Sequence, residues 1–425
     1  MAEIDRFVSF TLPEPERTIT PANTGSIRVC VVQNPSPSRR IDAIVFAAAV
    51  ALSLSCWPLT PWAAAAGAST SAVVAAETTI PHYRARFERQ RPLVAVVGEN
   101  SGTELTDFVI PYGVLSQSGA ADVVTVATHP GDLRMRPALK IRPDYTIDQF
   151  DARFAEGADY VIVPAVGKRD DPTLLAWVAA QSDKGATLVS ICDGALVLAH
   201  AGLLEGRRAV AHWATHSQRR RQFPETEWMQ NTRYVADGNI VSTAGISAAI
   251  PTSIALVEAI AGRARAAALA AELGVADWSA RHDSERFRPR LGVNLKPYFA
   301  TVVANPTFHR MKHLGLPVST GVDEMALALT VDAFSRTGRS HALSFADTAE
   351  PIVTRNRLLV IPDVTADQAQ HVDEYLPALP EGPSMQMFDV ALNAIAQRYG
   401  RSTARGVALA FEYADYEAKP ASGRH

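Results

Sequence analysis

Residues 186–213 read ATLVSICDGALVLAHAGLLEGRRAVAHW. The apolar run 186–191 is typical of a short buried strand. From 194 to 204 apolar residues recur at helical spacing, and Gly206 ends the predicted helix. Cys192 therefore lies on a sharp turn between a strand and a helix. A nucleophile on such a turn is lifted out of the sheet, and the helix N-terminus favours its thiolate. The alternative is a buried, inert cysteine.

Strand-like and helix-like segments alternate on both sides of this turn. Apolar runs at 93–97, 123–127 and 160–163 predict further strands. Helical patterns cover 102–115, 171–181 and 251–273. Such alternation predicts an α/β fold with a doubly wound, mainly parallel sheet, whose chemistry lies at the carboxyl ends of the strands. Cys192 ends its strand and so lies at that edge.

The strand–turn–helix segment around Cys192 carries a long and specific motif. The residues that carry it are Ser190-Ile-Cys192, Gly194, Leu196-Val-Leu198, Ala201-Gly-Leu-Leu204, Gly206-Arg-Arg208 and His212-Trp213. This stretch resembles the nucleophile elbow of the ThiJ/PfpI superfamily, in its isocyanide-hydratase branch and the related sensor domains of AraC-type regulators. The resemblance runs from about Leu93 to Gly274. It implies a flavodoxin-like fold of the class I glutamine-amidotransferase type, with a cysteine nucleophile.

The resemblance also implies an acid that points at the cysteine sulfur. Asp107, Pro111 and Val114-Leu115 match that part of the family pattern. A neutral carboxyl can donate a hydrogen bond to sulfur and so stabilise the thiolate. We therefore expect the Asp107 carboxyl within hydrogen-bonding reach of Cys192, a strained backbone at Cys192, and alkylation well below the ordinary thiol pKa of about 8.5. Glu104 is the rival acid.

Other residues are candidates for the pocket. Asp193 stands where the family has a small residue, so its carboxylate is expected to raise the thiol pKa. Ala165-Val166 replaces the Gly-Gly pair that supplies an oxyanion amide, and His212 is expected to be structural. The resemblance implies that segment 244–247, which follows the apolar run 240–243, approaches the nucleophile from the far side. The candidate binding residues are Asp193, Ala165, Val166, His212, Thr243 and Gly245.

The amino-acid composition limits the classes of molecule that the protein is expected to bind. The 425 residues carry a net charge of −3 and are 47% hydrophobic, which gives no support to nucleic-acid binding. Cys30, Cys56 and Cys192 form neither a disulfide framework nor a zinc spacing. We therefore expect no metal and no cofactor, and a small molecule as substrate or ligand.

The N-terminal part predicts a membrane segment. Residues 1–40 are polar and Pro-rich, typical of a disordered tail. Residues 41–67 are almost continuously apolar and longer than the roughly 20 residues that span a bilayer. Arg39 and Arg40 precede the segment, which places the bulk of the chain outside the cytoplasm. We expect a retained anchor, followed by a linker over 68–90. The alternative is a cleaved signal peptide, with secretion of the remainder.

The C-terminal part contains a degenerate internal repeat. Segment 321–338 parallels 102–119 at an offset of 219, and 388–400 parallels 250–262 at an offset of 138. The second copy is therefore 81 residues shorter, lacks the elbow and has Ala326 in place of Asp107. The predicted organisation is a ThiJ/PfpI-like domain over 91–274, a connector over 275–317, a truncated copy over 318–418 and a tail over 419–425. A homodimer is compatible with the resemblance.

Two functions fit these observations. In the first, Cys192 attacks a small electrophile in a hydratase, hydrolase or glyoxalase-type reaction, and Asp107 handles the proton. In the second, the same pocket senses oxidants or a small ligand without turnover. The sequence does not name the substrate.

Overall fold

The computed structural model describes residues 79–413 and residue 416. The predicted tail 1–40, the apolar segment 41–67 and the tail 419–425 lie outside the described residues, as does the first part of the linker, 68–78. Within the described part of the chain, no helix is both long enough and apolar enough to cross a membrane.

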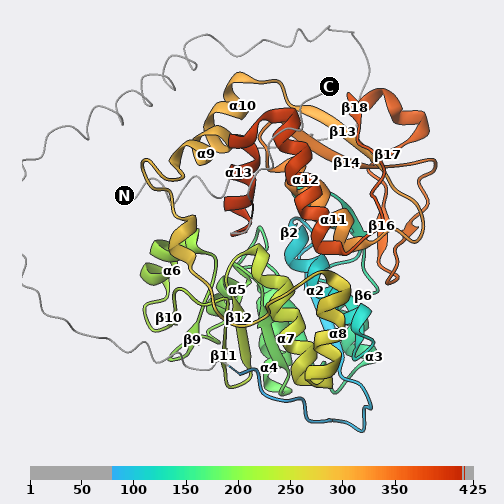
Figure 1. Ribbon diagram of the computed structural model, residues 1–425. Coiled ribbons are helices and arrows are strands. Elements are labelled where there is room, and N and C mark those ends of the chain that lie inside the picture. Colours follow the sequence, from blue (N-terminus) through green and yellow to red (C-terminus); the bar gives the residue numbers. More distant parts are fainter. Residues whose placement is uncertain (1–78, 414–415, 417–425) are drawn as a thin grey trace, which may run out of the picture. The chain divides into compact units, whose positions relative to one another are not determined.

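A seven-stranded sheet forms the centre of the first half (Figure 1). Its strand order is β11-β12-β8-β7-β1-β3-β6, and every neighbouring pair is parallel except β11 with β12. The strands are β1 (Leu93–Gly98), β3 (Asp122–Ala127), β6 (Tyr145–Thr146), β7 (Tyr160–Val163), β8 (Thr187–Ser190), β11 (Tyr234–Asp237) and β12 (Ile240–Thr243). All six residues of β1 are buried, as expected for the centre of a parallel sheet.

Helices cover both faces of this sheet. On one face Val94 and Val96 share a core with the first group of helices, and on the other Ala95 and Val97 share a core with the second. The first group is α2 (Leu105–Ser118), α7 (Ala249–Ala261) and α8 (Arg263–Leu273). The second group is α3 (Ile147–Arg153), α4 (Pro172–Asp183) and α5 (Gly194–His200). The predicted doubly wound, flavodoxin-like fold is confirmed.

The helix predicted over 251–273 is divided into two helices, α7 and α8. We expected a continuous helix over 251–273, but the chain turns at Gly262, between α7 and α8, with φ +84° and ψ 164°. Glycine adopts this conformation at little cost, so the apolar periodicity continues across a break in the backbone.

The second half has its own parallel sheet, in the order β17-β14-β13-β18. Its elements are β13 (Lys312–Pro317), α11 (Glu324–Ser335), β14 (Ser340–Ala346), β17 (Val364–Thr365), β18 (Glu374–Tyr375), α12 (Ser384–Tyr399) and α13 (Arg401–Ala410). The expected connector 275–317 is more ordered than its Arg- and Pro-rich sequence indicates. It contains α9 (Leu295–Phe299), the π-helix η5 (Ala300–Ala304), α10 (Asn305–Phe308) and the whole of β13.

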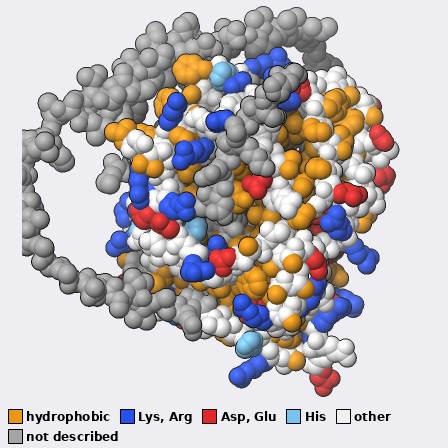
Figure 2. All heavy atoms as spheres, in the orientation of Figure 1, with side chains coloured by type: hydrophobic (Ala, Val, Ile, Leu, Met, Phe, Trp, Pro, Cys, Tyr) orange, Lys and Arg blue, Asp and Glu red, His pale blue; other side chains and the backbone are white. Residues whose placement is uncertain are grey.

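A third sheet joins the two halves, with strand order β15-β16-β5-β4-β2. Its members are β2 (Thr103–Glu104), β4 (Leu133–Arg136), β5 (Lys140–Arg142), β15 (Ile352–Val353) and β16 (Leu359–Ile361). Antiparallel pairing of β5 with β16 crosses from one half to the other. Helices α2 and α11 also pack together, and one hydrophobic core contains buried residues of both halves. Acidic, basic and hydrophobic side chains are intermingled on the face drawn in Figure 2.

Candidate functional site

Cys192 follows β8 and precedes α5, with a backbone φ of +56°. Non-glycine residues rarely adopt this left-handed conformation, and such strain tends to persist at functional sites. The turn is tight because Gly194 N donates to Ile191 O at 2.8 Å. A Cβ at Gly194 would lie 1.9 Å from the carbonyl oxygen of Val163 on β7. Only glycine allows this close approach, so the predicted strained elbow is confirmed.

The cysteine is held by its neighbours and is only 7% exposed. Its backbone amide donates to Thr243 Oγ1, at the end of β12, over 3.1 Å. Its sulfur accepts a hydrogen bond from the Asp193 amide. Thr243 thus lies beside the nucleophile position, where the sequence placed a candidate pocket residue.

Asp107 is completely buried on α2, but it does not bond to the cysteine sulfur. Its Oδ2 accepts from the Ala165 amide at 3.2 Å, while its Oδ1 is buried without a hydrogen-bond partner among the described residues. The predicted hydrogen bond from Asp107 to Cys192 is therefore wrong. The amide of Ala165, one of the candidate binding residues, holds this carboxyl. Burial raises the pKa of Asp107 well above its ordinary value.

The rival acid is occupied elsewhere. Glu104 pairs with Arg336, the residue that follows α11, and Arg336 Nε also donates to Asp332 Oδ1 at 2.6 Å. This ion-paired group links the two halves of the chain. Glu104 is therefore a structural carboxylate, and Asp107 is the acid near the cysteine.

Asp193 is tied down on both oxygens. Thr215 Oγ1 donates to Oδ1 at 2.7 Å, and Arg169 lies 3.4 Å from Oδ2. A side chain that the sequence did not single out completes this network. Arg219 is buried, donates to the backbone oxygen of His212 at 2.5 Å and to Thr215 Oγ1 at 3.1 Å, and lies over the Trp228 ring. Burial lowers the pKa of Arg219 to about 10.

The thiol is surrounded by negative charge. Burial raises the pKa of Cys192 well above its ordinary value, and Asp107, Asp193 and Glu412 raise it further. The hydrogen bond from the Asp193 amide acts in the opposite direction but does not compensate. The expectation of an unusually acidic thiol is therefore wrong, whereas the expected effect of Asp193 on the thiol pKa is present.

Both ring nitrogens of His212 face other groups. Nδ1 accepts from the Ala214 amide at 3.2 Å. Nε2 lies 3.4 Å from Ala410 O and 3.7 Å from Glu412 Oε1. The ring has no nitrogen left to act as a base towards Cys192, which agrees with the structural role expected for it.

The last two candidates are close to the backbone of the site. Val166 is buried and forms an isolated antiparallel bridge with Thr103. Gly245 follows Ala244 after β12, and a Cβ there would lie 2.6 Å from Glu412 Cδ. Glu412 comes from the far end of the described chain and belongs to no motif of the sequence.

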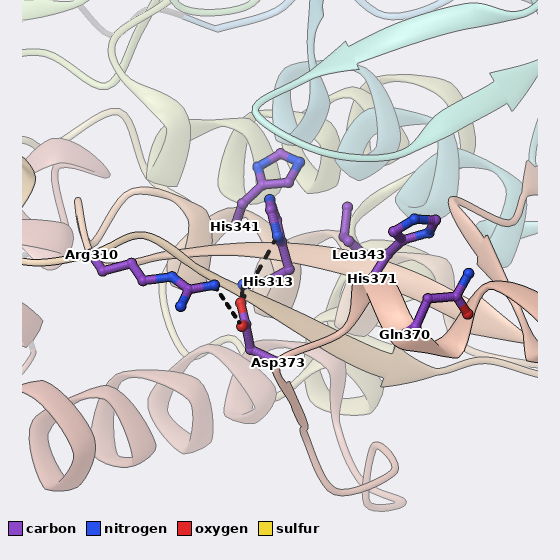
Figure 3. Close-up of a pocket in the computed structure, with 7 residues that line it drawn as sticks. All are labelled: Arg310, His313, His341, Leu343, Gln370, His371 and Asp373. Carbon is purple, nitrogen blue, oxygen red and sulfur yellow. Dashed lines mark hydrogen bonds and ion pairs between the residues drawn. The ribbon is translucent and has the colours of Figure 1, made fainter. Parts of the chain in front are cut away.

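A separate hollow of about 410 Å³ lies over the second sheet (Figure 3). It is lined by Arg310, His313, His341, Leu343, Gln370, His371 and Asp373. Asp373 Oδ2 accepts from the His313 amide at 2.8 Å, and Arg310 lies 3.3 Å from Oδ1. The hollow contains no residue of the cysteine site. Among the described residues, no group of three His, Cys, Asp or Glu side chains could hold a metal ion.

Comparisons with known proteins match the first half of the chain. The DJ-1/PfpI family pattern matches residues 93–259. Isonitrile hydratase of Pseudomonas putida is 29% identical over 161 residues, which are 37% of this chain and 67% of that protein. The HTH-type transcriptional regulator CdhR of Pseudomonas aeruginosa is 30% identical over 125 residues, which are 29% of this chain and 37% of the regulator.

The crystal structure of Drosophila melanogaster DJ-1beta aligns with 44% of this chain and 100% of its own, at 20% identity and a TM-score of 0.40. The matched family region contains β1, α2, the cysteine elbow and most of α7. Residues 93–259 of this chain thus match the DJ-1/PfpI family pattern.

Proposed function

We propose that this protein is a cysteine-dependent hydratase or hydrolase that acts on a small, uncharged electrophile, with an isonitrile as the reference substrate. The observation that carries the proposal is the combination of a strained Cys192 with a buried Asp107 whose Oδ1 has no partner among the described residues. The similarity to isonitrile hydratase supports the substrate class.

Charge pairing supports an uncharged substrate. Asp193 is paired with Arg169, and Glu412 with His282 at 2.8 Å. The guanidinium of Arg219 already donates to backbone and hydroxyl oxygens. A charged substrate would have to displace one of these partners, whereas a neutral one would not.

Hydration of an isonitrile needs both a nucleophile and a proton, and this site holds both. The sulfur of Cys192 bonds to the terminal carbon, and the thiol proton passes to that carbon, which gives a thioimidate. Water then adds to the same carbon. One water proton goes to the nitrogen, and the other goes to sulfur as the carbon–sulfur bond breaks, so an N-substituted formamide leaves with the original thiol proton as its formyl hydrogen. Asp107 Oδ1 is the position through which the proton is relayed.

Formation of N-cyclohexylformamide from cyclohexyl isocyanide tests the proposal. We expect turnover by the full chain, its loss in Cys192→Ser, and a strong decrease in Asp107→Asn. Cys30→Ser and Cys56→Ser are matched controls that should keep the activity. Turnover that survives in Cys192→Ser would refute the proposed role of this residue.

A ligand or redox sensor is the second candidate, and one observation favours it. The Ala165 amide, at the position where the resembling family supplies a second oxyanion amide, is engaged by Asp107. A sensor would bind the isonitrile, or be oxidised at Cys192, without releasing product. Ligand-dependent thermal stabilisation without formamide would favour this candidate over the enzyme.

Location is part of the proposal. The apolar length of segment 41–67 and the arginines before it support a retained anchor, with the cysteine domain outside the cytoplasm. Carbonate washing of membranes should leave the full-length protein in the pellet. Release of the full-length protein into the wash would refute the anchor.

A further inference from the structure

The strand pair that joins the two halves has the register of a two-fold axis. Ile141 of β5 pairs with Val360 of β16, and these positions are 219 apart. The flanking pairs are Arg142 with Leu359 and Lys140 with Ile361. Since Leu359 is the counterpart of Lys140 and Ile361 that of Arg142, the two flanking pairs exchange when the halves are exchanged. Only an isologous contact, the kind formed by two copies of one chain, has this property.

The helix pair repeats the same symmetry. Thr106 on α2 donates to Asp332 on α11 at 3.1 Å. The counterparts of these residues at an offset of 219 are Met325 and Gly113. A Cβ on Gly113 would lie 2.6 Å from Met325 Cγ, so these two residues also touch across the interface.

Each half also repeats one internal hydrogen-bond motif. In the first half, Asp144 Oδ2 accepts from the amide and the hydroxyl of Thr125, at 2.8 and 2.9 Å. In the second, Asp363 Oδ2 accepts from the amide and the hydroxyl of Ser344, at 3.0 and 2.8 Å. Both residues of the second pair lie 219 positions after those of the first.

The terminal helix pairs correspond at an offset of 138. Gly262 joins α7 to α8 with φ +84° and ψ 164°, and Gly400 joins α12 to α13 with φ +89° and ψ 155°. Gly274 ends α8 with φ +76°, and its counterpart is Glu412, with φ +56°.

Contacts made by these terminal residues cross between the halves in a symmetric way. A Cβ on Gly274 would lie 3.1 Å from Pro383 Cβ, and one on Gly245 would lie 2.6 Å from Glu412 Cδ. Pro383 is the counterpart of Gly245, 138 positions later. Exchange of the two halves therefore converts the contact of Gly274 with Pro383 into the contact of Glu412 with Gly245.

Glu412 breaks the symmetry where the cysteine site lies. A glycine would adopt its left-handed conformation freely, whereas a glutamate is strained there. The side chain is completely buried: Oε2 contacts His282 Nε2 at 2.8 Å, and Oε1 accepts from the Trp213 amide at 3.2 Å. Its own backbone oxygen accepts from Ser247 Oγ at 2.8 Å. Glu412 thus ties together the segments that follow His212 and Gly245, beside the cysteine.

We propose that the second half of the chain takes the place of a second subunit and supplies Glu412 as a positioning residue of the Cys192 site. The role given to Glu412 rests on one part of the proposed function, namely that Cys192 is the reactive group. The charged groups that act on Cys192 are Asp107, Asp193, Glu412 and, with the opposite sign, Arg219.

The test measures the pH midpoint of Cys192 alkylation by iodoacetamide, resolved by peptide mass spectrometry, so it does not need turnover. Glu412→Gln removes the charge and keeps the shape, so we expect the midpoint to fall by about one pH unit. Glu412→Gly relieves the backbone strain and should lower the midpoint similarly. Glu374→Gln, a carboxylate of the second sheet paired with Lys312, is the matched control and should leave it unchanged.

A midpoint that stays at the wild-type value in both Glu412 variants would overturn the positioning role. A separate measurement tests whether the second half replaces a second subunit. Light scattering of the full-length protein in detergent should give the mass of one chain after the mass of the detergent is subtracted. A stable dimer at micromolar concentration would contradict it. Failure of isonitrile turnover would leave both of these results intact, so the two proposals fail separately.

Discussion

Replacement of Gly194 by alanine tests whether the elbow geometry depends on close contact between β7 and α5. The added Cβ would lie 1.9 Å from Val163 O, and contacts below 3.0 Å essentially never occur. The strand or the helix must therefore move by about 1 Å. Overpacking of this kind costs about 3 kcal/mol, and more is not unusual when backbone atoms are involved.

Thermal unfolding gives the readout. A loss of about 3 kcal/mol should lower the Tm by about 6 °C in a chain of this size. Gly206→Ala is the matched control: its φ is +67° and no atom lies within 4 Å of the added Cβ. It should therefore cost only about 1 kcal/mol of backbone strain, or about 2 °C. Equal melting temperatures for Gly194→Ala and the wild type would refute the proposed close packing.

Three further predictions follow from the buried charges. Arg336→Leu removes the partner of the Glu104 and Asp332 carboxylates between the two halves. It should lower the free energy of unfolding in urea by about 3 kcal/mol, and an unchanged value would show that the ion pairs are dispensable. Burial raises the pKa of Asp107 in the folded protein above its unfolded value of 3.8, so this carboxyl makes a contribution to stability that is lost as pH rises above 3.8. Asp107→Asn should remove this contribution, and identical pH profiles of urea unfolding for the wild type and the variant would contradict it. The pH midpoint of Cys192 alkylation should lie above about 8.5 and should fall in Asp193→Asn. A wild-type midpoint below about 8 would contradict the conclusion that burial and the neighbouring carboxylates raise the pKa of this thiol.

The elbow could be predicted because its causes are local in sequence. A buried strand, a strained cysteine and a glycine two residues later leave the chain few alternatives. The sheet topology followed from the alternation of strands and helices, and Thr243 from the expected return of the chain to the nucleophile.

Interactions that depend on tertiary contacts could not be predicted in this way. Which group the Ala165 amide faces depends on how α2 packs against the strand ends, and the structure gives it to Asp107. Arg219 lies on a short helix with no motif, and nothing in its neighbourhood indicates burial. Glu412 did leave a signal, since it stands 138 positions after Gly274, where a glycine would end the helix. A charged residue at that position of the second copy marks a departure that the repeat alone does not explain.

Acid quenching of the full chain during reaction with cyclohexyl isocyanide tests the central claim most directly. The account predicts that the peptide containing Cys192 gains the mass of one isonitrile molecule, while the peptides with Cys30 and Cys56 stay unmodified. The adduct should be absent from Cys192→Ser and should form more slowly in Asp107→Asn, which cannot relay the proton. Formamide production with no modified Cys192 peptide at any quench time, or an adduct on another residue that persists in Cys192→Ser, would contradict the account.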